Sequence, residues 1–183
     1  MERVKDKIFL HINKSANFQV GKTYIFGKKI NPFFKFYEEW EPNSTTNEKQ
    51  LLQEFSTYVR ERIFEDMRIK NFPECPSRMK CLWLMPESQK SINYWTRKIP
   101  NYLNIVKFKC SGIIHRGDGR YLTPMYFNLS LQRNLAMSYW SGASVSDDDE
   151  NDRYKEILFV GEATVIDIIP PFPVPNLLEP EIL

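Results

Sequence analysis

Apolar residues recur along the chain with two distinct periods, and these periods predict its strands and helices. Residues 7–12 and 105–114 alternate in part between apolar and polar positions, as half-buried strands do. Gly112 interrupts the second of these segments and predicts a bend or bulge there. The short apolar run 80–85 is strand-sized, and residues 156–169 (EILFVGEATVIDII) form the most strand-like segment.

Helical spacing appears in three other segments. In the first, apolar residues stand at Leu51, Leu52, Phe55, Val59, Ile63 and Met67. Possible N-cap residues lie at 44–47, so we expect a helix over 48–69 with this apolar stripe in the core. A short helix is expected to follow Ser88 and run to Lys98, and Asn128 is placed to cap a third helix that ends near Trp140. Residues 31–41 are interpreted as a loop.

Strands separated by helices in unequal blocks predict an α+β fold. The chain is long enough for one domain, which we expect to occupy residues 1–169. Residues 144–153 form an acid-rich, hydrophilic loop, with a turn expected at 117–119. The tail 170–183 contains five prolines and no period, so it should run extended over the surface or bind a partner.

The composition, 42% hydrophobic and 14% aromatic, is sufficient for a packed core. No apolar run approaches the ~20 residues of a membrane-spanning helix. Only about four apolar residues precede His11, too few for the core of a signal peptide, so a cytoplasmic location is expected. The three cysteines are Cys75, Cys81 and Cys110; they lack metal-ligand spacing, so we expect reduced thiols and no metal site.

The net charge of +2 hides an asymmetry between the two ends of the chain. Residues 1–35 carry eight Lys or Arg against two acids, whereas residues 144–183 carry two against ten. Solvated faces of a soluble protein explain this pattern as well as a functional surface does. The acid-rich end would repel phosphates close to it.

Standard sequence signatures of dinucleotide folds, P-loops, zinc proteases and serine hydrolases are absent. Three segments together resemble the poly(ADP-ribose) polymerase branch (H-Y-E) of the ADP-ribosyltransferases. They are residues 10–18 (LHINKSANF), 81–94 (CLWLMPESQKSINY) and 155–160 (KEILFV). The last is also similar to the catalytic strand of small bacterial toxins of this superfamily. The motifs cover about thirty residues, and the chain between them does not align.

The resemblance implies a site for NAD on split mixed or antiparallel sheets with flanking helices, in a single domain. By this resemblance, His11 would hold ribose hydroxyls with help from Asn13. Trp83 and Tyr94 would cover the two faces of the nicotinamide ring, and Ser91 would bind its carboxamide. Trp83 replaces the Tyr of the family, which keeps the stacking surface but loses a hydroxyl.

Glu156 is the candidate catalytic residue. Cleavage of the bond between nicotinamide and ribose passes through a transition state that resembles an oxocarbenium ion. A carboxylate held near this developing positive charge stabilises it, and the head of a buried strand is a suitable place for one. Glu162 is a rival, because it lies six residues further on and on the same face of a regular strand. We favour Glu156 because Glu162 follows Gly161, where a bulge is possible.

Each candidate also has an ordinary structural interpretation. His11 could be a strand histidine with satisfied ring nitrogens, and Ser91 a helix-surface serine. Trp83 and Tyr94 could be packing residues. Since Trp83 lies between Leu82 and Leu84, however, strand alternation turns it toward the opposite face, which must be a cleft or a second layer.

The resulting hypothesis is an NAD-dependent mono-ADP-ribosyltransferase, a toxin of a toxin–antitoxin or phage-defence system. The lack of the long domains of the polymerases favours a single transfer. Arginines at 60, 62, 68, 78 and 97 and the basic N-terminal third favour RNA or DNA as the acceptor. Alternatives are a protein mono-ADP-ribosyltransferase, an NAD glycohydrolase, and a non-catalytic module that binds nucleic acid or a partner. The acidic loop or the tail could bind an antitoxin.

Overall fold

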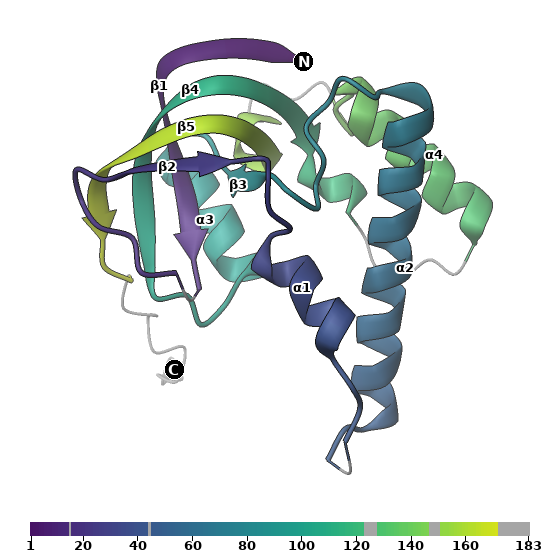
Figure 1. Ribbon diagram of the computed structural model, residues 1–183. Coiled ribbons are helices and arrows are strands. Elements are labelled where there is room, and N and C mark those ends of the chain that lie inside the picture. Colours follow the sequence, from purple (N-terminus) through teal and green to yellow (C-terminus); the bar gives the residue numbers. More distant parts are fainter. Residues whose placement is uncertain (15, 44, 123–127, 147–150, 172–183) are drawn as a thin grey trace, which may run out of the picture.

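The computed structural model describes residues 1–14, 16–43, 45–122, 128–146 and 151–171 (Figure 1). Its strands are β1 (Glu2–Asn13), β2 (Thr23–Phe26), β3 (Leu82–Leu84), β4 (Asn104–Asp118) and β5 (Lys155–Ile169). Its helices are α1 (Pro32–Glu39), α2 (Glu48–Asn71), α3 (Gln89–Lys98) and α4 (Leu129–Ser141), with short 3-10 turns η1 (Gly119–Tyr121) and η2 (Asn151–Tyr154). The predicted α+β class is confirmed.

The five strands form one antiparallel sheet in the order β1-β4-β5-β2, with β3 also paired to β5. β3 pairs with the first part of β5, from Ile157 to Phe159, and β2 pairs with the second part, from Gly161 to Thr164. The longest ladder joins β4 and β5. β5 is therefore the strand that every other strand except β1 contacts directly.

The sheet closes at one point, because β1 also meets the end of β3. Leu10 and Met85 exchange both backbone hydrogen bonds, at N–O distances of 3.0 and 2.8 Å. β1 is thus bonded to β4 along one edge and to Met85 on the other. This junction brings the middle of β1 next to β3 and the first residues of β5, and it positions the candidate site.

Side chains alternate between two cores on either side of β3 and β5. Leu82, Leu84, Ile157 and Phe159 belong to the core enclosed by the strands. Trp83 and Leu158 point the other way, into a second core with α2 and α4. The prediction that Trp83 faces away from its two leucine neighbours is therefore confirmed. A third core joins α3 to β1 and β4.

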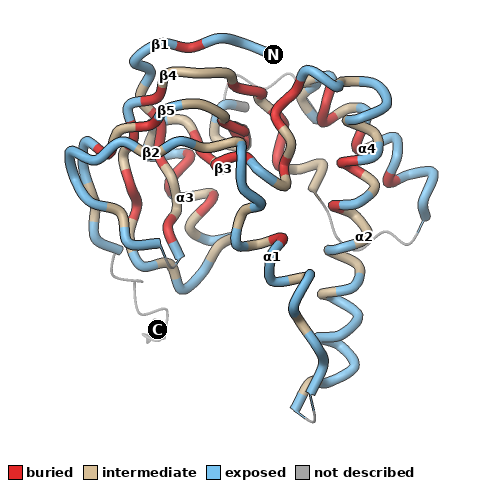
Figure 2. Tube along the Cα trace, viewed as in Figure 1, coloured by how far each residue is buried: buried red, intermediate tan, exposed pale blue. Residues whose placement is uncertain are grey.

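α2 is buried along only part of its length (Figures 1 and 2). Phe64 is fully buried against α4, with Tyr139 at a ring-centroid distance of 5.5 Å. Toward its N-terminus α2 projects away from the sheet beside α1, and Leu52 and Phe55 are 53% and 62% exposed. The expectation that the whole apolar stripe of this helix is core is wrong, because α4 covers only its C-terminal part. We call the described residues of 32–59 the arm.

Two local predictions need correction, and a third is supported. Residues 32–39 form α1 rather than a loop, since Asn31 caps Phe34 N–H and Pro32 occupies the first helical turn. β4 runs on through Gly117 and Asp118, where the sequence predicts a turn. At Gly112, where the sequence predicts a bend or bulge, the β1–β4 ladder does shift its register, between the pairs Val4–Gly112 and Lys7–Cys110. Gly112 also faces Gly161 across the β4–β5 ladder, and a Cβ on it would lie 2.2 Å from the Val160 carbonyl oxygen.

Among the described residues, no helix is both long and apolar enough to cross a membrane. The helices expected after Ser88 and Asn128 are present, and both residues are the N-caps. Residues 147–150 of the acidic loop and 172–183 of the Pro-rich tail lie outside the described residues.

Candidate functional site

A small pocket opens where β1, β3 and the start of β5 meet. It has a volume of about 70 Å³, and its lining residues come from these strands and from α3: Leu10, His11, Ile12, Trp83, Leu84, Met85, Trp95, Ile99 and Glu156. Three of the predicted site residues, His11, Trp83 and Glu156, therefore share one cavity. They come from positions far apart in sequence, and the β1–β3 junction brings them together.

His11 is fixed by the backbone of β3. Its Nδ1 lies 2.8 Å from the carbonyl oxygen of Trp83, so Nδ1 carries the proton and donates it. Burial lowers the pKa of His11 to about 4, against the opposing effect of this hydrogen bond. At neutral pH the ring is uncharged, and its Nε2 is a lone-pair acceptor.

The Glu156 carboxylate is held from one side by two buried side chains. Its Oε2 accepts a hydrogen bond from the Tyr139 hydroxyl at 2.6 Å and forms an ion pair with Arg78 Nη1. Burial, and then the nearby Glu156 charge, raise the pKa of Tyr139 well above its usual value, so the hydroxyl stays protonated and donates. No hydrogen bond joins the other oxygen, Oε1, to any residue that the structure describes.

Gly117 explains how Tyr139 reaches this carboxylate. Gly117 is the cross-strand partner of Glu156, and a Cβ on it would lie 2.2 Å from the Tyr139 ring. Any other residue at this position would push the ring away from the strand pair. The sequence predicts Gly117 in a turn, whereas in the structure it makes room for Tyr139, which donates a hydrogen bond to Glu156.

Arg78 is the centre of a buried charge network that the sequence did not reveal. Its Nε donates to Glu61 Oε2 at 2.8 Å, and its Nη1 donates to both Glu156 and the Tyr139 hydroxyl. Burial opposes a charge on Glu61, but Arg78 and Arg60 outweigh it and hold the pKa of Glu61 below its usual value. Arg60 lies 2.7 Å from Glu61 and completes the network.

Trp83 lines the pocket and also connects it to α1. Its ring packs edge-on against Phe33 and Phe34, at centroid distances of 5.1 and 6.3 Å. The Arg78 guanidinium lies 5.5 Å from the same ring. The indole Nε1 of Trp83 and that of Trp95 are buried and have no hydrogen-bond partner among the residues that the structure describes. Both tryptophans line the pocket.

Ser91 and Tyr94 lie on α3, beside the 3-10 turn that leads into β5. The Ser91 hydroxyl is buried, 3.0 Å from the Ser88 hydroxyl and 3.5 Å from the carbonyl oxygen of Asp152. The Tyr94 ring packs against Tyr154 at 4.8 Å. Neither residue lines the pocket, and the structure places no ring contact between Tyr94 and Trp83 among the described residues.

Asn13 is buried at the end of β1, and its side chain forms hydrogen bonds with the backbone of Ala16. Its amide nitrogen donates to the carbonyl of Ala16 at 2.8 Å, and its amide oxygen accepts from Ala16 N–H at 2.9 Å. Its amide nitrogen also donates to the Asn104 side chain at 3.0 Å. These bonds make Asn13 a support of the turn after β1, two residues from His11.

Glu162 lies on the same strand face as Glu156, but it is exposed and does not line the pocket. It is exposed and pairs with Ser111 and Ile25 at the far part of β5. The ladder keeps its register through Gly161, and the irregularity in β5 lies instead beyond Val165. The possible bulge at Gly161 is therefore wrong, although Glu162 does lie away from the pocket.

The described residues contain no group of three or more His, Cys, Asp or Glu side chains that could hold a metal ion. Cys75, Cys81 and Cys110 are buried free thiols. Burial raises the pKa of Cys110 to about 12, which keeps this thiol protonated and unreactive.

Comparison with known proteins places the chain in a family without assigning it an activity. No curated relative matches it. Residues 9–171 match the family described as "Protein of unknown function (DUF2441)", and this range includes every element from the middle of β1 to the end of β5. The chain belongs to the DUF2441 family.

Proposed function

We propose that this protein is an NAD-dependent mono-ADP-ribosyltransferase with Glu156 as its catalytic residue. The observation that carries the proposal is the convergence of His11, Trp83 and Glu156 on one pocket. These three positions belong to sequence motifs that are far apart along the chain. The β1–β3 junction that joins them could not be derived from those motifs.

In the proposed reaction, the bond between the nicotinamide nitrogen and ribose C1′ breaks, and its electron pair leaves with neutral nicotinamide. Ribose C1′ takes on oxocarbenium character, and a nucleophile of the acceptor forms the new bond there and loses its proton. No general acid is required. The carboxylate of Glu156 stabilises the developing positive charge and accepts a hydrogen bond from a ribose hydroxyl.

The contacts of Glu156 suit this role. Arg78 and Tyr139 hold Oε2, which fixes the orientation of the carboxylate before substrate arrives. Oε1 keeps its lone pairs for a ribose hydroxyl. Because Arg78 is also bonded to Glu61, its positive charge is shared between two carboxylates.

His11 supplies a second acceptor for ribose hydroxyls. Its proton is committed to the Trp83 carbonyl through Nδ1, so the neutral ring offers Nε2 as an acceptor. Trp83 offers an aromatic surface for the nicotinamide ring at the same pocket. Tyr94 remains the predicted contact of the second face of the nicotinamide ring, and Ser91 that of its carboxamide. Neither residue lines the pocket, so these two contacts require α3 to move toward the bound ligand.

The size of the pocket limits what enters it. About 70 Å³ is well below the ~300–1,000 Å³ typical of sites for drug-sized ligands. We therefore assign the pocket to the nicotinamide end of NAD alone, with the adenylate end outside. RNA or DNA is the proposed acceptor, and the basic residues of β1, Arg3, Lys5 and Lys7, are exposed on the same strand as His11.

The test is incubation with NAD labelled in its adenylate half, together with separate pools of RNA, DNA and protein. Label should enter one pool as nicotinamide is released, and we expect RNA or DNA. Label in protein would reassign the acceptor. Free ADP-ribose without labelled acceptor would indicate a glycohydrolase, and no nicotinamide release from the wild type would refute the proposal.

Glu156→Gln should reduce nicotinamide release by about 100- to 1,000-fold. Glu162→Gln is the matched control, since it makes the same change on the same face of β5 outside the pocket, and it should keep wild-type activity. Protection by NAD against thermal unfolding should persist in Glu156→Gln, which separates lost chemistry from lost binding. Equal losses in the two variants would remove Glu156 from the catalytic role.

A further inference from the structure

The arm displays a group of large apolar side chains to solvent. Phe36, Leu51, Leu52, Phe55 and Tyr58 are between 38% and 62% exposed, and we call them the arm patch. Leu51, Phe55 and Tyr58 are spaced four and three residues apart and so share one face of α2. Tyr58 contacts Tyr37 at 5.7 Å, and Tyr37 contacts Phe36 at 5.1 Å, which joins the α1 part of the patch to the α2 part.

The arm is held in place by its own contacts. The Tyr37 hydroxyl donates to Glu54 Oε2 at 2.8 Å and links α1 to α2. Phe33 packs between Tyr37 and Trp83, at centroid distances of 5.2 and 5.1 Å. A chain of aromatic contacts thus runs from the pocket to the arm. A surface that is ordered before it binds loses little conformational entropy on binding.

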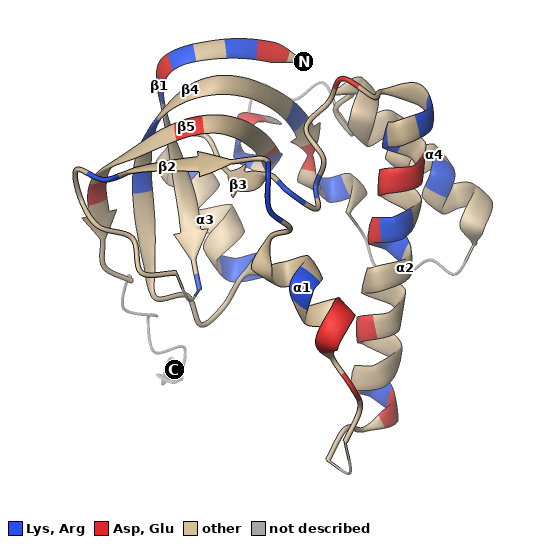
Figure 3. Ribbon diagram, in the orientation of Figure 1, with Lys and Arg blue, Asp and Glu red and all other residues tan. Residues whose placement is uncertain are grey.

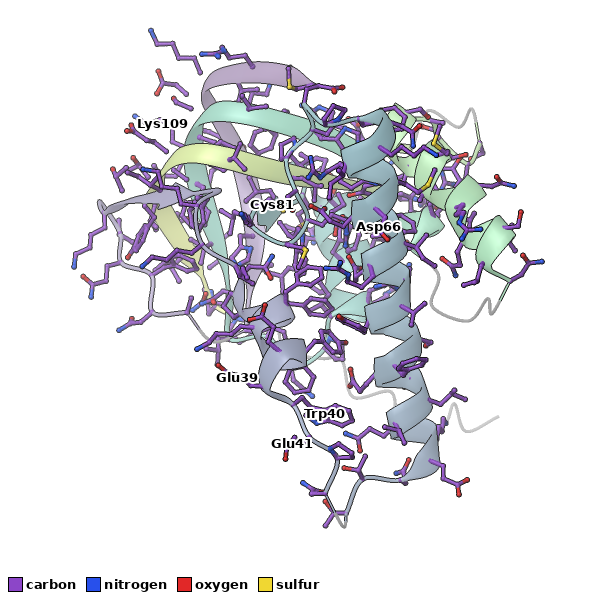
Figure 4. All side chains as sticks on the ribbon, turned by 45° about the vertical axis from the view of Figure 1, so that its right-hand side comes forward. Glu39, Trp40, Glu41, Asp66, Cys81 and Lys109 are labelled. Carbon is purple, nitrogen blue, oxygen red and sulfur yellow. The ribbon has the colours of Figure 1, made fainter. Side chains whose placement is uncertain are left out.

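The arm carries more acidic than basic positions, on α1, on the segment that follows it and on α2 (Figure 3). Residues 32–59 contain five glutamates, at 38, 39, 41, 48 and 54, against two lysines, at 35 and 49. Lys35 is paired with Glu39 at 3.2 Å. Figure 4 shows Glu39, Trp40 and Glu41 together on the lower part of the arm, away from Cys81 in the body of the protein. The arm therefore has a net charge of −3, whereas the whole chain has a net charge of +2.

The apolar and acidic side chains of the arm indicate the charge and polarity of the surface that would bind there. Nucleic acid and anionic lipid surfaces both carry negative charge and would be repelled by the glutamates. An apolar patch on an arm with an excess of glutamates fits a protein segment whose apolar side chains are flanked by Lys or Arg. We propose that the arm patch binds a partner protein through a basic amphipathic helix. This proposal does not depend on NAD chemistry.

Two synthetic peptides of about 18 residues would test this proposal. Both carry leucine at the same positions of an amphipathic helix; the polar face is lysine in one and glutamate in the other. Binding of each fluorescently labelled peptide to the full chain is followed by fluorescence anisotropy. The lysine peptide should bind at least 10-fold more tightly than the glutamate peptide, and added salt should lower the affinity of the lysine peptide.

The double variant Leu52→Ser/Phe55→Ser should bind the lysine peptide at least 10-fold less tightly than the wild type does, because central apolar side chains dominate the binding energy of such interfaces. Val20→Ser/Ile25→Ser is the matched control, since these residues are also 61% and 63% exposed but lie outside the arm, and it should bind as the wild type does. Glu38→Lys/Glu41→Lys should reverse the preference between the peptides.

Three outcomes would overturn the proposal. The first is equal binding of both peptides, and the second is binding that the arm variant leaves unchanged. The third is self-association of the wild-type protein, measured by sedimentation velocity, that is lost in the arm variant. This result would mean that a second copy of the chain occupies the arm patch. Circular dichroism of each variant shows whether its helices are retained.

Discussion

The two halves of α2 have similar apolar spacing but different surroundings. Toward its C-terminus, Phe64 is buried against α4 and Glu61 joins the Arg78 network, so this half supports the candidate site. Toward its N-terminus, Leu52 and Phe55 are exposed. Helical periodicity shows that a helix has an apolar face, but it does not show whether another element of the same chain covers that face.

The difference between the halves also separates two roles for apolar residues. In the body they supply the packing that keeps Arg78, Tyr139 and Glu156 in contact without competing water. In the arm they remain available for another molecule. The three predictions below test the role of the buried body, with controls at exposed positions of α2 or at its N-terminal end.

Arg78→Met should destabilise the protein by about 3–5 kcal/mol, because it leaves Glu61 and Glu156 buried without their shared partner. Arg62→Met is the matched control, since Arg62 lies on an exposed part of α2. It should change the free energy of unfolding by less than about 0.5 kcal/mol. Urea unfolding measures both. Similar values for the two variants would mean that the charge network does not stabilise the fold.

Phe64→Ala should cost about 3–5 kcal/mol through lost burial and the cavity it leaves. Phe55→Ala makes the same substitution nine residues earlier on the same helix and should stay within about 0.5 kcal/mol, apart from the small helix-propensity gain of alanine. Thermal unfolding of the two variants provides the comparison. A large loss of stability in Phe55→Ala would show that the arm patch is covered in solution.

The two histidines, both in the body, should make stability depend on pH. Burial lowers the pKa of His11 and of His115 to about 4. Between pH 6.5 and 5 the unfolded chain binds protons at these positions and the folded chain does not, so stability falls as the pH falls. His115 is 3% exposed and should contribute about 1.5 kcal/mol over this window.

His115→Gln should remove that contribution, which urea unfolding at pH 6.5 and 5 would reveal as a smaller difference between the two conditions. Asn47→Ala, a change at the arm end of α2, provides the control and should leave the pH dependence as it is in the wild type. A pH dependence that is identical in wild type and His115→Gln would contradict the buried, uncharged state of this ring.

The sequence predicted the elements whose signals are local. Periodicity located α2 and β5, and capping residues located α3 and α4. α1 was missed although Asn31 and Pro32 are a recognised helix start, because the aromatic-rich segment was interpreted as a loop. The exposed half of α2 was misjudged because burial depends on residues far away in sequence.

The candidate site was predictable only in part for the same reason. The motifs point to Glu156, His11 and Trp83, which line one pocket, and also to Asn13, Ser91 and Tyr94, which do not. Arg78 and Tyr139, which hold Glu156, have no local pattern that distinguishes them from other arginines and tyrosines. Gly117 was interpreted as part of a turn, whereas its role depends on a ring from α4.

The position of β5 in the sheet has a consequence for folding during synthesis. β5 is the last of the described strands along the chain, yet it lies between β4 and both β2 and β3. A nascent chain that has not reached residue 155 therefore has β2 and β3 without their partner, and the Glu156 carboxylate is absent. Pairings of such long sequence separation form slowly. A ribosome must complete nearly the whole domain before the candidate site can assemble, so incomplete chains should be inert.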